Sequence, residues 1–405
     1  MIDPLDSAAV RRRYLLDPEV LYLNHGAFGA CPAEVLEAQA EFRRRLEREP
    51  VRFFLRECEP LLDEARAALA ALVGADPADL AFVPSATHAV NTVLRSLEPE
   101  LGPGDELLTT DHAYNACRNA LDFVAARTGA RVVVAPIPFP VPSPGAAIAP
   151  VREAVTPRTR LALLDHLTSV TGLVLPLERL VPELEARGVA CLVDGAHAPG
   201  ALALDLRALG ATYYAGNLHK WIGAPKGAAF LHVRADRRDR IRPLSISHGA
   251  NSTRTDRSRF HLEFDWTGTA DPSPWLAVPA AIRFLSSLLP GGLPALAARN
   301  RALCLAARAD LARLLGVELP CPEELIGPLA SLPLSDGTLP MPALDPLQDA
   351  LFARGIEVPV HPLAASTGAA PGTYRRILRI AAAPYLGLAD FAPLHAALRE
   401  LLPLP

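Results

Sequence analysis

The chain has 405 residues, a length that supports a sizeable hydrophobic core and predicts two domains. Half of the residues are hydrophobic and 21% are charged, which excludes a disordered chain. The formal net charge of −4 is nearly balanced and indicates neither a nucleic-acid partner nor an anionic membrane surface.

The six cysteines are scattered and form no C-x-x-C pair, which argues against a zinc site and against a disulfide framework. We therefore expect reduced thiols in a cytoplasmic protein. No apolar segment follows Arg11–Arg13, so no signal peptide is predicted. No run of about 18 apolar residues is present to predict a membrane span.

Short apolar runs alternate with longer helical patterns from residue 80 onward. In chain order the sequence predicts strand 80–84, helix 86–97, strand 105–111, helix 112–128, strands 131–137 and 160–166, helix 176–187, and strands 190–194, 212–215 and 228–233. This alternation is typical of βαβ units and indicates an α/β fold with a largely parallel sheet. Ligands bind at the carboxyl ends of the strands in such sheets.

The remaining segments suggest a second domain. Residues 139–150 are dense in Pro, Gly and Ala and predict a loop, and residues 234–259 predict an irregular excursion. The last third predicts helices 274–289 and 293–315, β-like stretches 329–334 and 377–381, and a terminal helix 388–401. We expect an N-terminal segment (1–20), a large domain (21–270) and a smaller α+β domain (271–405).

An aspartate ends one predicted strand, at Asp194, and His197 follows it three residues later. A carboxylate buried at a strand end is costly unless a cation or strong donors pair with it. A protonated pyridine nitrogen is such a partner, and it acts as an electron sink when it stays protonated. The alternative is that Asp194 caps the turn or helix that follows.

The chain contains only two lysines, Lys220 and Lys226. Lys220 follows a strand and lies among apolar residues and glycines, where a lowered pKa would suit an amine that forms an imine. A solvated loop lysine is the alternative, but arginine fills nearly every other basic position. Lys226 lies in a predicted turn, where a surface position is the better interpretation.

A phosphate site is available where Ser85, Ala86 and Thr87 follow a strand and open a helix, since backbone N–H groups and a hydroxyl suit an anion there. Asn217 and His219, beside Lys220, add possible donors. Taken alone, this pattern also fits an ordinary N-cap.

Seven segments occur in one order along nearly the whole chain. They are Tyr22–Gly29 (YLNHGAFG), Phe82–Asn91 (FVPSATHAVN), Asp111–Ala116 (DHAYNA), Val193–His197 (VDGAH), Gly216–Trp221 (GNLHKW), Trp266–Asp271 (WTGTAD) and Leu378–Ile380 (LRI). This ordered set resembles the class V aminotransferase family of fold-type I enzymes that use pyridoxal 5′-phosphate (PLP), and within it the isopenicillin N epimerase-like group. The resemblance implies a mostly parallel central sheet in a large domain and a smaller α+β C-terminal domain.

The resemblance implies that Lys220 carries PLP as an imine and moves protons at the substrate α-carbon. It implies that Asp194 pairs with the ring nitrogen and that His197 bonds the phenolic oxygen, with Ser169 nearby. The residues that it implies for the phosphate are Ala86, Thr87, Asn217, His219 and, from a neighbouring subunit, Thr269.

A ring-stacking residue is expected between Asp111 and Ala116. Tyr114 is preferred over His112, because an aromatic face packs well on a pyridine ring. His112 alternatively caps a helix or lies in the core.

Arg379 matches the arginine that binds the substrate α-carboxylate, and bidentate geometry favours arginine for that task. Asn24 and His25 lie in the N-terminal segment that approaches the site in this family, although Asn-His-Gly also forms turns.

The resemblance implies an enzyme acting at the α-carbon of an amino acid, and an isopenicillin N epimerase-like activity is preferred. The alternatives are a C–S lyase on a sulfur-containing amino-acid conjugate, a class V aminotransferase, and a catalytically inert PLP-binding regulator. Persulfide chemistry is disfavoured, because His361–Tyr374 contains no cysteine where cysteine desulfurases keep theirs. A homodimer with shared active sites is expected by analogy, and no motif with metal-ligand spacing predicts a metal.

Overall fold

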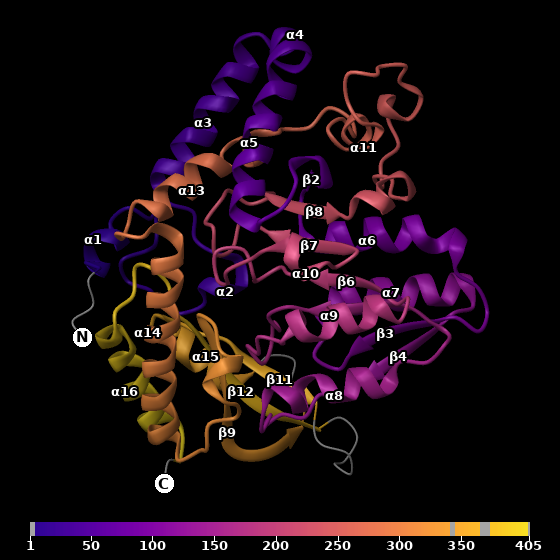
Figure 1. Cartoon of the computed structure of the whole chain (residues 1–405). Coiled ribbons are helices and arrows are strands. Elements are labelled where there is room, and N and C mark those ends of the chain that lie inside the picture. Colours follow the sequence, from indigo (N-terminus) through magenta and orange to yellow (C-terminus); the bar gives the residue numbers. More distant parts are fainter. Residues whose placement is uncertain (1–4, 341–344, 365–372, 404–405) are drawn as a thin grey trace.

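A computed structural model describes residues 5–340, 345–364 and 373–403 (Figure 1). Its centre is a seven-stranded sheet in the order β2-β8-β7-β6-β5-β3-β4. The strands are β2 (Leu80–Val83), β3 (Glu106–Thr110), β4 (Arg131–Ala135), β5 (Thr159–Asp165), β6 (Ala190–Asp194), β7 (Tyr213–Asn217) and β8 (Ala229–Val233). Only β8 runs antiparallel to its neighbours, so the other six strands end at one edge. The predicted α/β fold is confirmed.

Helices cover both faces of this sheet (Figure 1). On one face lie α6 (Ala86–Leu97), α7 (Asn115–Thr128) and α11 (Arg259–Phe264). On the other lie α5 (Cys58–Val73), α8 (Pro144–Ala154), α9 (Leu177–Ala186) and α10 (Leu206–Leu209). Apart from Arg160 near the start of β5, strands β5, β7 and β8 are buried along their length, which explains why they read as continuous apolar runs rather than alternating ones.

The N-terminal part is helical. It contains α1 (Ser7–Arg11), α2 (His25–Phe28), α3 (Ala33–Arg48) and α4 (Pro50–Arg52), and a π-helical turn (Phe53–Glu57) leads into α5. Helices α3 and α5 extend away from the sheet in Figure 1. Contacts join them to α12 (Ser273–Leu276) and α13 (Val278–Ser286). The expected elements began at residue 80, so these first helices were missed.

The C-terminal part contains the long helix α14 (Gly292–Leu315), α15 (Pro346–Phe352), α16 (Ala392–Leu401) and a sheet in the order β11-β12-β9. These strands are β9 (Leu329–Pro340), β11 (Val360–Ala364) and β12 (Thr373–Ala381). The N-terminal strand β1 (Leu21–Tyr22) pairs in parallel with β10 (Ile356–Glu357). The domain boundaries at residues 20 and 270 stay a prediction.

The loop predicted over residues 139–150 is wrong, because α8 occupies its second half. Ser143 caps this helix by accepting a hydrogen bond from the Ala146 N–H, and Pro144 stands at a first-turn position that needs no N–H donor. Pro150 lies inside the helix. The prolines that suggested a loop are therefore accommodated by a capped helix.

Other boundaries also moved. The helix expected from residue 112 begins at Asn115, and β9 and β12 are longer than their predicted cores. Strand β11 was not predicted. No helix in the described residues is long and apolar enough to cross a membrane.

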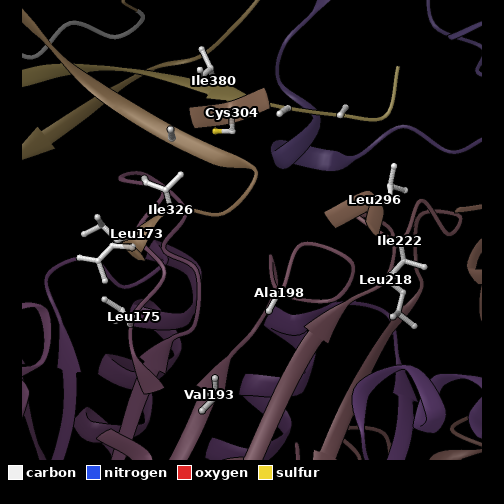
Figure 2. Packing of buried hydrophobic residues seen from close by; sticks show 14 of the residues in the cluster. Leu173, Leu175, Val193, Ala198, Leu218, Ile222, Leu296, Cys304, Ile326 and Ile380 are labelled. Atoms are coloured by element: carbon white, nitrogen blue, oxygen red, sulfur yellow. The ribbon is translucent and has the colours of Figure 1, made fainter. Parts of the chain in front are cut away.

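A continuous hydrophobic cluster packs beneath the loops that follow the central strands. Figure 2 shows Val193, Ala198, Leu218 and Ile222 together with side chains from the C-terminal part, such as Ile380. All five are at most 1% exposed. This packing fixes the short segments on either side of Asp194 and Lys220, which prepares their side chains for a defined geometry.

Candidate active site

A cavity of about 170 Å³ lies where the central strands end. Nine of the residues predicted from sequence line it: Ala86, Thr87, Tyr114, Ser169, Asp194, His197, Asn217, His219 and Lys220. They come from segments that follow β2, β3, β5, β6 and β7. The shared edge of the parallel strands thus brings together side chains separated by up to 134 residues.

Lys220 places its side-chain amine in this cavity. Its side chain is 9% exposed, and its Nζ lies 2.9 Å from Nε2 of His197. Burial lowers the pKa of Lys220 from 10.5 to about 8; the charge of Asp194 opposes this shift and that of Arg379 adds to it. A fraction of the amine is therefore unprotonated near neutral pH, which is the form that attacks a carbonyl.

The N-terminal helix α2 is held directly against the backbone of Lys220. Gly29 ends it with φ +68°, and a Cβ there would lie 2.3 Å from the carbonyl oxygen of His219. Nζ of Lys226, whose residue is exposed, donates to the Gly29 carbonyl at 3.0 Å. This close approach places Ala27 and Phe28 in the cavity wall.

Asp194 ends β6 and is 3% exposed. Its Oδ1 accepts a hydrogen bond from the Ala196 N–H at 3.0 Å, and its Oδ2 accepts one from the Cys117 thiol at 3.0 Å. Oδ1 of Asp194 therefore caps the turn that follows the strand, as the alternative interpretation expected. The carboxylate also lines the cavity, so capping does not account for the whole side chain.

His197 is buried beside Lys220. Burial first, and then the charge of Lys220, hold the pKa of His197 well below its usual range. Its Nδ1 is buried without a hydrogen-bond partner among the described residues. A neutral imidazole with one unpaired ring nitrogen is suited to bond a ligand oxygen that enters the cavity.

The opposite wall begins at helix α6. Ser85 caps this helix by accepting from the His88 N–H at 3.1 Å, and the Ala86 N–H donates to Oδ1 of Asn217 at 2.8 Å. Burial lowers the pKa of His219 to about 4, and its Nδ1 lies 3.1 Å from the Ala228 carbonyl oxygen. The positive end of helix α6 suits an anion.

Arg379 lies in β12 and contacts Ser169, a residue of the cavity lining, although Arg379 itself is not part of that lining. Its guanidinium donates to the Ser169 carbonyl and, at 3.0 Å, to Oδ1 of Asn24. Burial lowers the pKa of Arg379 to about 10, and its Nε is buried without a partner among the described residues. Asn24 is itself held by Glu357, to which its amide donates at 3.2 Å.

Besides Asn24 and Arg379, three predicted site residues do not line the cavity. His25 is buried with Nδ1 2.9 Å from the Tyr385 hydroxyl, and burial lowers its pKa to about 3. His112 lines a neighbouring cavity, where its ring nitrogens lie 2.8 Å from Thr171 Oγ1 and 3.1 Å from the Ile137 carbonyl. Thr269 is exposed.

Tyr114 behaves differently from these three residues. It lines the cavity and is 45% exposed. The geometry therefore favours Tyr114 over His112 as the aromatic residue facing a ligand.

The sequence reasoning missed Asp165. This residue ends β5, is 3% exposed and lines the cavity beside Asp194. A signal for it was present, because Leu161–Asp165 (LALLD) repeats the pattern of Cys191–Asp194 (CLVD), an apolar strand that ends in aspartate. Within the described residues, no group of three or more His, Cys, Asp or Glu side chains is placed to hold a metal ion.

The chain is similar to several known proteins. Isopenicillin N epimerase from Streptomyces clavuligerus is 39% identical over 345 residues, 82% of this chain and 85% of that protein. Putative L-cysteine desulfhydrase 1 from Oryza sativa subsp. japonica is 36% identical, over 78% of this chain and 67% of that protein. A solved C-DES mutant with glycine covalently linked to its PLP cofactor has a TM-score of 0.77 and 24% identity, covering 96% of this chain and 98% of that one.

The family model for class-V aminotransferases matches residues 21–333. This range includes Lys220, Asp194 and the whole central sheet. The resemblance found in the sequence is thereby confirmed, together with the PLP-dependent fold-type I architecture. The chain belongs to the class-V aminotransferase family of PLP-dependent enzymes.

Proposed function

We propose that this enzyme uses PLP on Lys220 to move a proton at the α-carbon of an amino acid, and that it is an epimerase. The observation that carries the proposal is the buried Lys220 amine, whose pKa of about 8 leaves it reactive in a cavity that Asp194 and His197 also line. Relatives named isopenicillin N epimerase, 39% identical, support epimerisation.

The cavity fits the cofactor in its chemistry. The unpaired Nδ1 of His197 suits a phenolic oxygen, the carboxylate of Asp194 suits a protonated ring nitrogen, and the face of Tyr114 suits the ring. The residues that would hold the phosphate are Ala86, Thr87, Asn217 and His219. When bound, PLP supplies an electron sink for negative charge at the α-carbon.

Residues of the chain bind the substrate and transfer the proton. Arg379 binds and orients the substrate α-carboxylate, and Asn24 and the Ser169 carbonyl hold its guanidinium in place. Lys220 takes the proton from the α-carbon and returns it on its own face.

Inversion also requires a proton carrier on the opposite face. Tyr114, His112 and His25 are the candidates from sequence, and of these only Tyr114 lines the cavity. We therefore assign this role to Tyr114. The bonds of His25 and His112 favour structural roles instead.

A C–S lyase acting on a sulfur-containing amino-acid conjugate is the second candidate. It is favoured by the relatives named L-cysteine desulfhydrase, up to 36% identical. An aminotransferase ranks third. A catalytically inert regulator is disfavoured, because it would not need Lys220, Asp194 and Arg379 together.

We further propose a cytoplasmic homodimer. The six cysteines are free, which suits a reducing compartment. Thr269 is exposed and does not line the cavity of its own subunit, so it contributes to a phosphate site only if a second copy supplies it. Phe28, at the cavity, is 71% exposed and would be covered by such a copy. A monomer that retains full activity would contradict this assembly.

The test starts from purified enzyme titrated with PLP, followed by borohydride reduction and peptide mapping. We expect pyridoxyl on Lys220 in the wild type and in Lys226→Arg, and none on the chain in Lys220→Ala. Label confined to Lys226, or no PLP binding by the wild type, would overturn the proposal.

The reaction type is then read in D₂O with amino acids and their sulfur conjugates. An epimerase incorporates deuterium at the α-carbon and produces the opposite configuration. A lyase instead releases a keto acid and a sulfur product, and an aminotransferase leaves the amino group on the cofactor. If lyase products or transamination are observed without inversion at the α-carbon, the proposed epimerase activity is wrong and the observed reaction takes its place.

A further inference from the structure

Two carboxyl groups lie side by side at the edge of the central sheet. Asp165 and Asp194 are register partners on the adjacent parallel strands β5 and β6, so their side chains project from the same face of the sheet. Each is 3% exposed, and both line the Lys220 cavity. The proposed mechanism uses only Asp194.

The surroundings of the pair supply few donors and one nearby cation. Asp194 accepts hydrogen bonds from the Cys117 thiol and the Ala196 N–H. The ammonium of Lys220 acts on both carboxyls, but its hydrogen bond is to His197. Two ionised carboxylates at this position would repel each other in a desolvated site.

Within this pair of carboxyl groups, Asp165 has a raised pKa. Burial first, and then the negative charge of Asp194, raise the pKa of Asp165 well above its usual range. The backbone N–H groups of Tyr114 and of Asp165 itself, and the charge of Lys220, act in the opposite direction. The buried carboxyls thus favour a state with one negative charge between them.

We propose that Asp165 is a positioning residue for Asp194, and that it stands beside Asp194 as a neutral carboxylic acid. The pair then presents a single negative charge to the cavity, carried by the carboxylate that already has two fixed donors. This charge is the one that the proposed function assigns to the ring nitrogen of PLP, so the role of Asp165 in catalysis rests on that function. The protonation of Asp165 in the cofactor-free protein does not depend on the proposed function.

The test therefore begins with the cofactor-free enzyme and the variant Asp165→Asn, which keeps the shape of the neutral acid. In the unfolded chain Asp165 ionises as pH rises above about 4, whereas in the folded chain it stays neutral until its raised pKa is reached. The wild type accordingly loses stability over this range, and Asp165→Asn does not share that loss.

We expect the melting temperature of Asp165→Asn minus that of the wild type to be larger at pH 7.5 than at pH 5, by at least about 2 °C. The matched control Asp239→Asn, at an exposed position, should show the same difference at both pH values. In an Asp194→Asn background the pH-dependent gain should shrink, because the neighbouring charge is gone. A gain that is independent of pH, or unchanged in that background, overturns the proposal.

A second measurement does not depend on the variant folding. The infrared spectrum of the wild type at pH 7.5 should contain the C=O stretch of a protonated carboxyl, shifted on transfer to D₂O. Its absence overturns the proposal.

A PLP titration separates the two hypotheses. Asp165→Asn should bind PLP within about threefold of the wild type at pH 7. Failure of both proteins to bind PLP would sink the proposed function and leave the stability result standing. A loss of more than about tenfold in the variant alone would show that Asp165 acts as an anion, against this inference.

Discussion

The depressed pKa of Lys220 leads to a quantitative prediction for the cofactor-free enzyme. A pKa of about 8 instead of 10.5 corresponds to about 3 kcal/mol in favour of the neutral amine. At pH 7 roughly 9% of Lys220 is then unprotonated, against about 0.03% for an ordinary lysine, a difference of roughly 300-fold. Burial also lowers the pKa of Lys226, but Lys226 is the more exposed of the two lysines and should titrate at a higher pH than Lys220.

Carbamylation by cyanate measures this difference, because the small reagent enters the cavity and attacks only neutral amines. The rate at each lysine is followed across pH by peptide mass spectrometry. We expect a midpoint near pH 8 for Lys220 and a higher one for Lys226 in the same digest.

The perturbations follow from the charges around the amine. Asp194→Asn removes a charge that favours the ammonium and should move the Lys220 midpoint to lower pH, whereas Arg379→Met removes a repelling charge and should move it to higher pH. A Lys220 midpoint above 10, or one that neither substitution moves, would refute the reasoning that burial and these two charges set the reactivity.

Three further predictions concern the walls of the cavity. Gly29→Ala should destabilise the enzyme by about 1–3 kcal/mol more than Gly188→Ala in chemical denaturation, because both have positive φ but only the first meets a backbone, at the His219 carbonyl. Arg379→Met should raise KM for amino acids by about 10- to 100-fold and leave PLP affinity within about twofold, by steady-state kinetics and titration; equal loss of both would place the arginine at the cofactor. Tyr114→Phe should reduce inversion by about 10²-fold while α-proton exchange continues in D₂O; undiminished inversion would assign the second proton carrier elsewhere.

The central sheet was predictable because its strands are short apolar runs between turn residues, and because ligand-binding residues follow strand ends. The same pattern, a polar residue at or after the end of an apolar strand, drew attention to Asp194 and Lys220. It also marked Asp165, but a strand-end aspartate gains meaning only when its register partner is known, and the partner strand is not adjacent in sequence.

The failures have identifiable physical causes. In α8 a capped first turn accommodates the proline that suggested a loop. His25 and His112 have the right residue type in the right motif, yet partners distant in sequence, Tyr385 and Thr171, turn their rings away from the cavity. The pattern of a motif specifies where the backbone passes, whereas tertiary contacts decide where each side chain points.

The hydrogen bond between Arg379 and Asn24 has a consequence for biosynthesis. The residues that line the Lys220 cavity all lie between Ala27 and Lys220, so that half of the chain contains the lining on its own. Asn24 and Arg379 are separated by 355 residues, and a closure of this length is among the last that a chain can make during synthesis. Synthesis must pass Arg379 before this pair can form, so the residues that line the cavity leave the ribosome well before the arginine to which the proposed function assigns the substrate carboxylate.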